Sequence, residues 1–232
     1  MSAATVRIFD LPEMRNHSQV FRDRTHAGAV LAGMLGELRG TDTLVLAIPA
    51  GGVPVAVEVA GQLQLPLDLA VVSKITLPWN TEAGYGAVAY DGTIRLNDNL
   101  VTALALPPDV IRQGVADTKE KVQRRMHKLR GDRPQPDLKQ RTALLIDDGL
   151  ASGFTLLTAV EAVRQLGADK ILAAVPTGHA GAVARIAAEV DSVYCPNIRQ
   201  GLSFAVADAY RQWTDVDESA VVEIMDRFRQ IN

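Results

Sequence analysis

The sequence predicts an α/β protein with a Rossmann-like parallel sheet flanked by helices. Short apolar segments of strand length alternate with longer segments of helical periodicity along most of the 232 residues. Two of the apolar segments run directly into glycine-rich turns that open a helix, as at the functional edge of such sheets. The composition, 47% hydrophobic and 22% charged, suits one well-buried core, so we expect a single domain over residues 1–232.

In the first half of the core, the sequence predicts a helix followed by one strand–helix–strand unit. Residues 20–39 place their apolar side chains at helical spacing and predict an amphipathic helix. TLVLAI at 43–48 has the length and aliphatic character of a buried strand. The loop PAGGVP at 49–54, a helix at 55–63 and a second strand, LDLAVVS at 67–73, follow it.

Two insertions separate this unit from the rest of the core. Residues 77–97 are glycine-rich and carry a turn signal at Asp91-Gly92, so we expect a long loop with a short hairpin, of the kind that often forms a lid. Residues 107–138 predict a helical insertion, with a charged helix over 109–130. The cations in the second half of that helix suit its C-terminal end, which favours a solvated face over a phosphate contact.

A second run of alternating elements completes a core of about residues 20–195. Its expected members are a strand at 143–146, a helix at 155–166, a strand at 171–175, a helix at 180–190 and a short strand at 192–195. The tail, 196–232, contains much of the small aromatic set.

Composition restricts the classes of partner and compartment. A formal net charge of −3 argues against a broad nucleic-acid surface. The single cysteine, Cys195, precludes an internal disulfide framework and fits a reducing compartment. No apolar run approaches the ~20 residues of a membrane span, and the N-terminus lacks a signal-peptide pattern. We therefore expect a cytoplasmic protein without nucleic-acid or membrane partners.

Residues 142–155, TALLIDDGLASGFT, are the most informative segment. Asp147 and Asp148 fall where a buried strand ends, and successive side chains of an extended segment point opposite ways, so two carboxylates can straddle a ligand. Behind them, glycines permit tight turns, and hydroxyls lie beside backbone N–H groups at a helix N-terminus: Gly149, Ser152, Gly153 and Thr155. The segment predicts a site for a phosphorylated sugar.

Other glycine-loop chemistries fit this segment less well. A Walker A loop needs a lysine after its last glycine, and a dinucleotide-binding loop needs G-x-G-x-x-G; the segment has neither. A response-regulator-like acidic pocket would not need the serine, glycine and threonine behind Asp147 and Asp148. An ordinary helix cap explains one hydroxyl but neither the paired acids nor both glycines.

The string LLIDDGLASGFT resembles the phosphoribosyl diphosphate (PRPP) signature of the type I phosphoribosyltransferases. The resemblance implies the fold of that family, with residues 77–97 as a flexible lid and 196–232 as the hood. It also implies that Asp147 and Asp148 hold the ribose hydroxyls. The 5-phosphate would be wrapped by Gly149, Leu150, Ala151, Ser152, Gly153, Phe154 and Thr155.

A second loop supports this resemblance. IPAGGVP at 48–54 follows a buried strand and opens a helix, so its backbone N–H groups can face an anion. In the resembling enzymes this loop binds the pyrophosphate and often contains a strained or cis peptide, which here would fall within 49–51. The implied substrate-binding residues are Ala50, Gly51 and Gly52.

Lys74, at the end of the strand 67–73, could neutralise a leaving diphosphate, although a solvent-exposed lysine is an equally good interpretation. The resemblance extends to FRDRTHAG near the start, the K-x-x-x-P-x-N-x-E stretch at 74–82 and GAVAYDGT at 86–93. The residue before the lysine is commonly arginine in the resembling branch. Here it is Ser73, which removes one expected charge contact.

Further candidates come from the lid and the tail. Trp79, Asn80, Glu82 and Tyr85 are the candidate contributors from the lid, although a glycine-rich loop can equally be an oligomer contact. Phe204, Tyr210 and Trp213 could stack on a planar acceptor, but ordinary packing is the better interpretation for each. For His179, near a helix start, a capping or solvent role is favoured.

Together these features predict a phosphoribosyltransferase that moves the phosphoribosyl group of PRPP to a nitrogenous acceptor such as a nucleobase and releases pyrophosphate. The expected catalytic residues are Asp147, Asp148 and Lys74. The histidines and the cysteine show no metal-ligand spacing, so we expect Mg²⁺ bound with the diphosphate and no protein metal site. A PRPP sensor without turnover and a phosphosugar hydrolase remain open alternatives. We expect a homodimer.

Overall fold

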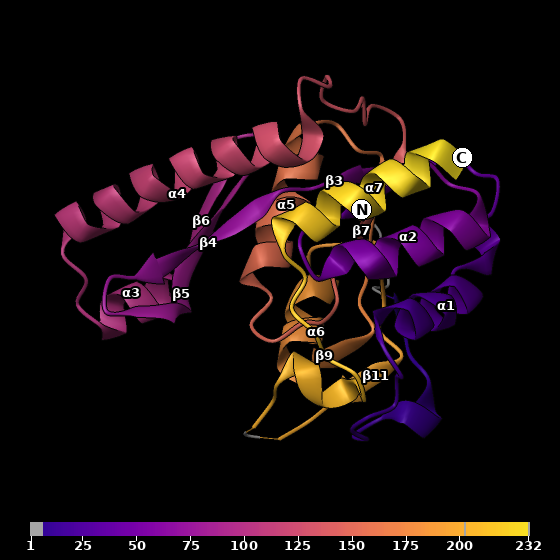
Figure 1. The fold of residues 1–232 in the computed structure, drawn as a ribbon. Coiled ribbons are helices and arrows are strands. Elements are labelled where there is room, and N and C mark those ends of the chain that lie inside the picture. Colours follow the sequence, from indigo (N-terminus) through magenta and orange to yellow (C-terminus); the bar gives the residue numbers. More distant parts are fainter. Residues whose placement is uncertain (1–6, 202, 232) are drawn as a thin grey trace, which may run out of the picture.

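The structure, a computed structural model, describes residues 7–201 and 203–231, except for the side chains of 81–83. A six-stranded parallel sheet with strand order β1-β10-β8-β7-β2-β3 lies at its centre (Figure 1). The strands are β1 (Arg7–Phe9), β2 (Thr43–Ala47), β3 (Leu67–Leu69), β7 (Thr142–Ile146), β8 (Lys170–Ala174) and β10 (Ser192–Tyr194). The predicted fold class is thereby confirmed.

Helices cover both faces of this sheet. On one face, Val45 and Ala47 of β2 belong to the same core cluster as residues of α1 (Arg24–Met34), α2 (Gly52–Leu63) and α7 (Glu218–Ile231). Leu44 and Leu46 point the other way and join a second cluster. That cluster contains residues of α5 (Phe154–Gln165) and α6 (Ala180–Ala187). The alternation along β2 is the expected pattern for a strand buried on both sides.

The helix predictions are right in type and inexact at their ends. The helix predicted over 20–39 is α1 followed by a 3-10 turn at Gly36–Leu38, and a further 3-10 turn lies at Pro12–Met14. Helix α2 begins three residues earlier than the expected start at 55. The reason is that the residues of the glycine turn themselves take helical geometry, since Gly51 already lies in the right-handed helical region.

Residues 67–97 differ from the sequence prediction. The single strand expected at 67–73 is divided into β3 of the main sheet and β4 (Val72–Leu77) of a separate sheet. The loop expected at 77–97 is mostly strand: β5 (Asn80–Ala89) pairs antiparallel with β4 and with β6 (Ile94–Leu96). The short hairpin expected around Asp91-Gly92 is confirmed, because β5 and β6 pair on either side of that turn.

The glycines of this segment explain the wrong loop prediction. A Cβ atom on Gly86 would lie 2.6 Å from the carbonyl oxygen of Arg95 on the neighbouring strand. Glycine is needed in a strand where another backbone comes this close, but in the sequence such a glycine cannot be told from a loop glycine.

The small sheet and the helices that follow it form an arm, defined here as residues 72–130. After β6 come α3 (Asp98–Ala103) and α4 (Pro108–Arg130). Figure 1 shows the arm projecting to one side of the core, with α4 running above β4 and β6. Helix α4 packs on β4, β5 and α7, so the helical insertion predicted at 107–138 is joined to both the arm and the core.

The tail is not one hood. Its first part forms β11 (Asn197–Arg199), which pairs with β9 (Thr177–His179), and a 3-10 turn at Val206–Ala209. Its last part, α7, returns to the core and packs on α2. The buried residues of α7 recur at helical spacing, which explains why this helix covers the core: Val221, Met225 and Phe228.

Within the described part of the chain, none of the helices combines the length and apolar character needed to cross a membrane.

The contact between α1 and α2 depends on Gly28. A Cβ atom there would lie 2.7 Å from both the Val55 carbonyl oxygen and the Glu58 Cβ, whereas a Cβ on Gly33, in the same helix, would meet nothing within 4 Å. We expect Gly28→Ala to lower the free energy of unfolding by about 1–3 kcal/mol through overpacking. Gly33→Ala should raise it by about 0.5–1 kcal/mol through helix propensity. Urea denaturation measures both, and equal midpoints for the two variants would contradict the prediction.

Candidate functional site

Two loops meet at the carboxyl ends of β2 and β7. Because Ala47 pairs with Ile146 in parallel register, the segments after the two strands leave the sheet side by side. A Cβ atom on Gly51 would lie 1.9 Å from Oδ2 of Asp148, and one on Gly52 would lie 2.7 Å from the Ile146 carbonyl oxygen. Glycine at both positions allows this close approach.

The loop after β2 has the backbone feature that the sequence led us to expect. The peptide bond between Pro49 and Ala50 is cis, which confirms the expectation for residues 49–51. Helix α2 starts immediately afterwards, and the Gly52 N–H donates to the Ile48 carbonyl. The predicted substrate-binding residues of this loop therefore lie at the N-terminal end of a helix.

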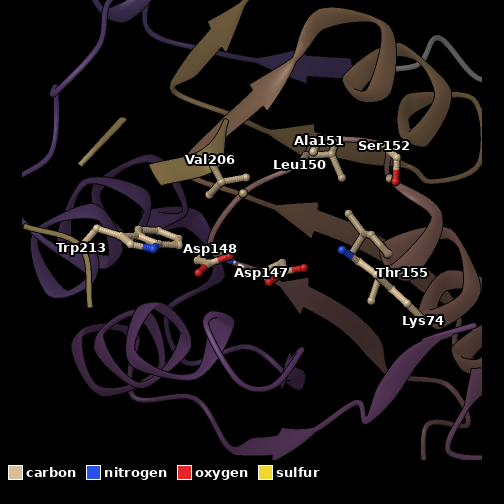
Figure 2. A pocket seen from close by; sticks show the side chains of 12 residues that line it. Lys74, Asp147, Asp148, Leu150, Ala151, Ser152, Thr155, Val206 and Trp213 are labelled. Atoms are coloured by element: carbon tan, nitrogen blue, oxygen red, sulfur yellow. Dashed lines mark hydrogen bonds between the residues drawn. The ribbon is translucent and has the colours of Figure 1, made fainter. Parts of the chain in front are cut away.

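A pocket of about 270 Å³ opens above the loop that follows β7 (Figure 2). It joins three parts of the chain: this loop with the start of α5, strand β4, and the tail before α7. The lining residues are Lys74, Asp147, Asp148, Gly149, Leu150, Ala151, Ser152, Gly153, Thr155, Leu156, Val206 and Trp213. Most predicted site residues are among them. Ala50, Gly51, Gly52 and Phe154 are not, and their contact with substrate stays a prediction.

The floor of this pocket leads into the N-terminus of α5. Gly153 has a φ of +83° and makes the turn into the helix. Leu150 anchors the loop to β9, because its N–H donates to Thr177 and its carbonyl accepts from His179, each at 2.9 Å. The first N–H groups of a helix have no partner within the helix, and the helix dipole is positive at this end. The arrangement is suited to an anion.

The two carboxylates lie between the loops and are electrostatically coupled. The Asp148 N–H donates to Asp147 Oδ1 at 2.9 Å. Burial raises the pKa of Asp147 well above its ordinary value, the Asp148 carboxylate adds to the rise, and the Lys74 ammonium opposes it. Figure 2 shows Lys74 on the opposite side of the pocket from Trp213, with its amine directed towards Asp147.

Arg24 is a site residue that the sequence analysis did not single out. Its Nε and Nη2 atoms both lie 2.9 Å from Asp148 Oδ2, and its Nη1 donates to the Thr214 carbonyl at 2.7 Å. Burial raises the pKa of Asp148, and this guanidinium opposes the rise. One feature could have indicated this role. Arg24 is the first residue of α1, where the helix dipole disfavours a positive charge, so an acidic partner elsewhere in the chain was to be expected.

The tail closes one side of the pocket. The Tyr210 hydroxyl donates to the Asp148 carbonyl at 2.5 Å, and Val206 lies so close to Gly149 that a Cβ there would be 2.3 Å from it. The guanidinium of Arg24 lies 3.8 Å from the centre of the Trp213 ring. Trp213 remains 38% exposed, so part of this ring is available to a ligand. Tyr210 instead serves packing and a backbone contact, as sequence favoured.

A second pocket of about 290 Å³ adjoins the first and shares Lys74, Asp147 and Thr155 with it. It is also lined by Ile48, Pro49, Val72, Ser73, Thr76, Lys121 and Arg125. The position of Lys74 corrects the sequence prediction, since this residue lies within β4 of the arm and not at the end of a core strand. It nevertheless reaches both pockets, because β4 runs past the loop edge of the core.

Other candidates lie elsewhere. Trp79 is 65% exposed, and Tyr85 is buried in the arm, where its hydroxyl donates to the Val110 carbonyl at 3.4 Å. Neither lines the two pockets, and the side chain of Glu82 lies outside the described residues. His179 caps α6 by accepting from the Gly181 N–H, which confirms the favoured interpretation. Phe204 contacts the His179 ring edge-on.

No group of three or more His, Cys, Asp or Glu side chains that could hold a metal ion occurs among the described residues.

The chain belongs to the phosphoribosyltransferase family. The family model described as "Phosphoribosyl transferase domain" matches residues 23–209, a range that includes both loops, Arg24 and the lining residues of the two pockets except Trp213. The resemblance noted in the sequence is therefore confirmed.

Particular relatives extend this match. Two Mycobacterium tuberculosis proteins, from strains H37Rv and CDC 1551 and each named "Putative phosphoribosyl transferase", are 40% identical over 211 residues. The match covers 90% of this chain and 47% of each relative, so the chain spans about half their length. The crystal structure of TT1426 from Thermus thermophilus is 33% identical, covers 90% of this chain and 98% of its own, and superposes with a TM-score of 0.73.

The raised pKa of Asp147 predicts a cost in stability. Folding favours the protonated carboxyl, so this group opposes folding increasingly as pH rises from its ordinary value of 3.8 towards the higher folded value. Asparagine cannot ionise, and its Oδ1 can still accept from Asp148. We expect Asp147→Asn to raise the free energy of unfolding by roughly 1 kcal/mol at pH 7 and to lose this advantage below pH 3.8.

Thermal unfolding at a series of pH values measures the effect. A variant that is less stable than the wild type at pH 7, or equally stabilised at every pH, would contradict the assigned direction of the pKa.

Proposed function

We propose that this protein binds PRPP and transfers its phosphoribosyl group to a nitrogenous acceptor, with release of pyrophosphate. The observation that carries the proposal is the pair of adjoining pockets that share Asp147, Lys74 and Thr155. PRPP has an anionic group at each end of a ribose. Each pocket could hold one anionic group of PRPP, and the carboxylates between the pockets could accept hydrogen bonds from the ribose hydroxyls.

The first pocket would hold the ribose 5-phosphate. Apart from Leu150, whose N–H donates to Thr177, the segment 149–153 and the N-terminus of α5 would donate backbone N–H groups, with the hydroxyls of Ser152 and Thr155 beside them. Asp147 and Asp148 would accept hydrogen bonds from the ribose hydroxyls. Hydrogen bonds from these hydroxyls favour ionised carboxylates, so substrate binding would offset the desolvation that burial imposes on them.

The second pocket would hold the diphosphate, with Lys74 as a counter-charge and with Ile48 and Pro49, at the start of the loop after β2, in its lining. Mg²⁺ bound with the diphosphate would supply further charge neutralisation of the leaving group. Mg²⁺ in such sites is usually bound by oxygen atoms of the substrate phosphates together with one or two carboxylates of the protein. The carboxylates beside this pocket are therefore enough for a metal ion that arrives with the diphosphate.

The reaction needs no covalent nucleophile from the protein. The acceptor nitrogen would form a bond to the anomeric carbon while the bond to the diphosphate oxygen breaks, and the electron pair of that bond leaves with pyrophosphate. Positive charge that develops on the ribose would lie near Asp147 and Asp148. Positioning and charge stabilisation are then the main contributions of the protein.

The exposed part of Trp213 provides a surface for a planar acceptor. Its ring borders the first pocket beside Asp148, and Arg24 holds it through a cation–π contact. The names of the Mycobacterium tuberculosis relatives support phosphoribosyl transfer as the class of reaction, and they leave the acceptor unspecified.

Pyrophosphate release from PRPP and Mg²⁺, measured with a panel of nucleobases and with none, tests the proposal. We expect release that depends on the base. Release without any base would indicate a hydrolase, and saturable binding without release would indicate a PRPP sensor. A protein that does not bind PRPP would contradict the whole assignment.

A carboxylate double variant tests the ribose contact. We expect Asp147→Asn combined with Asp148→Asn to weaken PRPP binding at least about 100-fold, because two charge-assisted contacts are lost at roughly 1.5–3 kcal/mol each. The variant should remain folded by circular dichroism. A matched control removes two exposed carboxylates away from the pockets, Asp132→Asn with Asp169→Asn, and should bind like the wild type. Unchanged binding by the first variant would show that the sugar assignment is wrong.

A further inference from the structure

Helix α4 borders the second pocket through two cations. Lys121 and Arg125 both line it, and they are four residues apart, so they lie on the same face of the helix. Both belong to the arm and lie outside the six-stranded core and the two loops. The pocket therefore receives charge from an element that the sequence led us to regard as a solvated helix.

Arg125 uses its guanidinium to join α4 to the rim of the pocket. Its Nη1 donates to the Val72 carbonyl at 3.0 Å and to Ser73 Oγ at 3.1 Å. Its Nη2 donates to the Pro49 carbonyl at 3.2 Å, and its Nε pairs with Glu218 at 2.9 Å. With these contacts and only 13% of its side chain exposed, Arg125 is a positioning residue that fixes α4 against the loop after β2.

Within the described residues Lys121 has no acidic partner; Arg112 and Lys119 of α4 are also unpaired there, but of these three only Lys121 lines the second pocket. Other cations of α4 are paired: Arg124 with Glu120, Arg125 and Lys128 with Glu218, and Arg130 with Asp68. Within the described residues, the structure records neither an ion pair nor a side-chain hydrogen bond for Lys121. Its side chain is exposed at the pocket lining, one helical turn from the anchored Arg125.

The charge of the second pocket is therefore unbalanced. Its ionisable lining residues are Lys74, Lys121, Arg125 and Asp147. Among the described residues, Glu218 pairs with both Arg125 and Lys128, and Lys74 acts on Asp147, which leaves the ammonium of Lys121 without a counter-charge. An anionic ligand in this pocket would provide that counter-charge.

We propose that Lys121 of helix α4 binds the diphosphate group of PRPP. The inference rests on the proposed function and adds a residue from the arm to the site. Lys74 and Lys121 then contribute cations from β4 and α4 respectively, and Arg125 holds the second of these elements in place. The phosphoribosyl end of the substrate lies in the first pocket, which Lys121 does not line.

Binding of two ligands by wild type and variants tests this inference. PRPP and ribose 5-phosphate share the ribose and the 5-phosphate, and only PRPP carries the diphosphate. Lys121→Gln should weaken PRPP binding about tenfold, the lower end for a hydrogen bond to a charged group. Its affinity for ribose 5-phosphate should equal that of the wild type. Isothermal titration calorimetry with Mg²⁺ present measures both.

Lys119→Gln is the matched control. Lys119 is an exposed lysine of the same helix, two residues away and outside both pockets, so its loss changes the net charge equally. It should bind PRPP within twofold of the wild type, and Lys121→Arg should retain most of the affinity. Wild-type affinity for PRPP in Lys121→Gln, or equal weakening of ribose 5-phosphate, would overturn the inference alone. Absence of PRPP binding by the wild type would overturn the proposed function as well.

Discussion

The parallel pairing of β2 with β7 is the constraint on which the site depends. The register that sets Ala47 opposite Ile146 brings two loops, almost a hundred residues apart in sequence, to the same point of the sheet edge. Their contact is close enough that Gly51 and Asp148 leave no space for a methyl group between them. The strands can hold this register because both are buried on two faces, where a slip by one residue would exchange the two core clusters.

The two carboxyl groups at this junction, Asp147 and Asp148, are in surroundings that make their ionisation unfavourable. Burial raises the pKa of both carboxyl groups, and the Asp148 carboxylate raises that of Asp147 further. Arg24 compensates Asp148 from α1, and Lys74 acts on Asp147 from the arm. The surroundings of the pair thus come from three parts of the chain. Groups with shifted pKa values often cluster in this way at functional sites, and such sites commonly lower the stability of the protein.

The sequence predicted the fold and the loop residues well because both depend on local patterns. Buried strands are continuous apolar runs, and the acidic and glycine residues are contiguous in Asp147–Gly153. The arm was missed because its strand glycines resemble loop residues and because no turn residue separates the end of β3 from the start of β4 in the sequence LDLAVVS. Arg24 was missed because its partner is 124 residues away. Helical spacing also did not reveal that Arg125 and Arg130 of α4 have little exposure, because it does not show which neighbour faces a side chain.

The close approach of α1 and α2 at Gly28 also bears on the pocket. Helix α1 begins with Arg24, and α2 begins where the loop after β2 ends, so the two helices carry opposite walls of the junction. Their separation determines how far the guanidinium of Arg24 extends towards Asp148. The absence of a side chain at Gly28, between α1 and α2, therefore helps to set the distance between these two walls. Gly28, which lines neither pocket, thus bears on the geometry of the contact between Arg24 and Asp148.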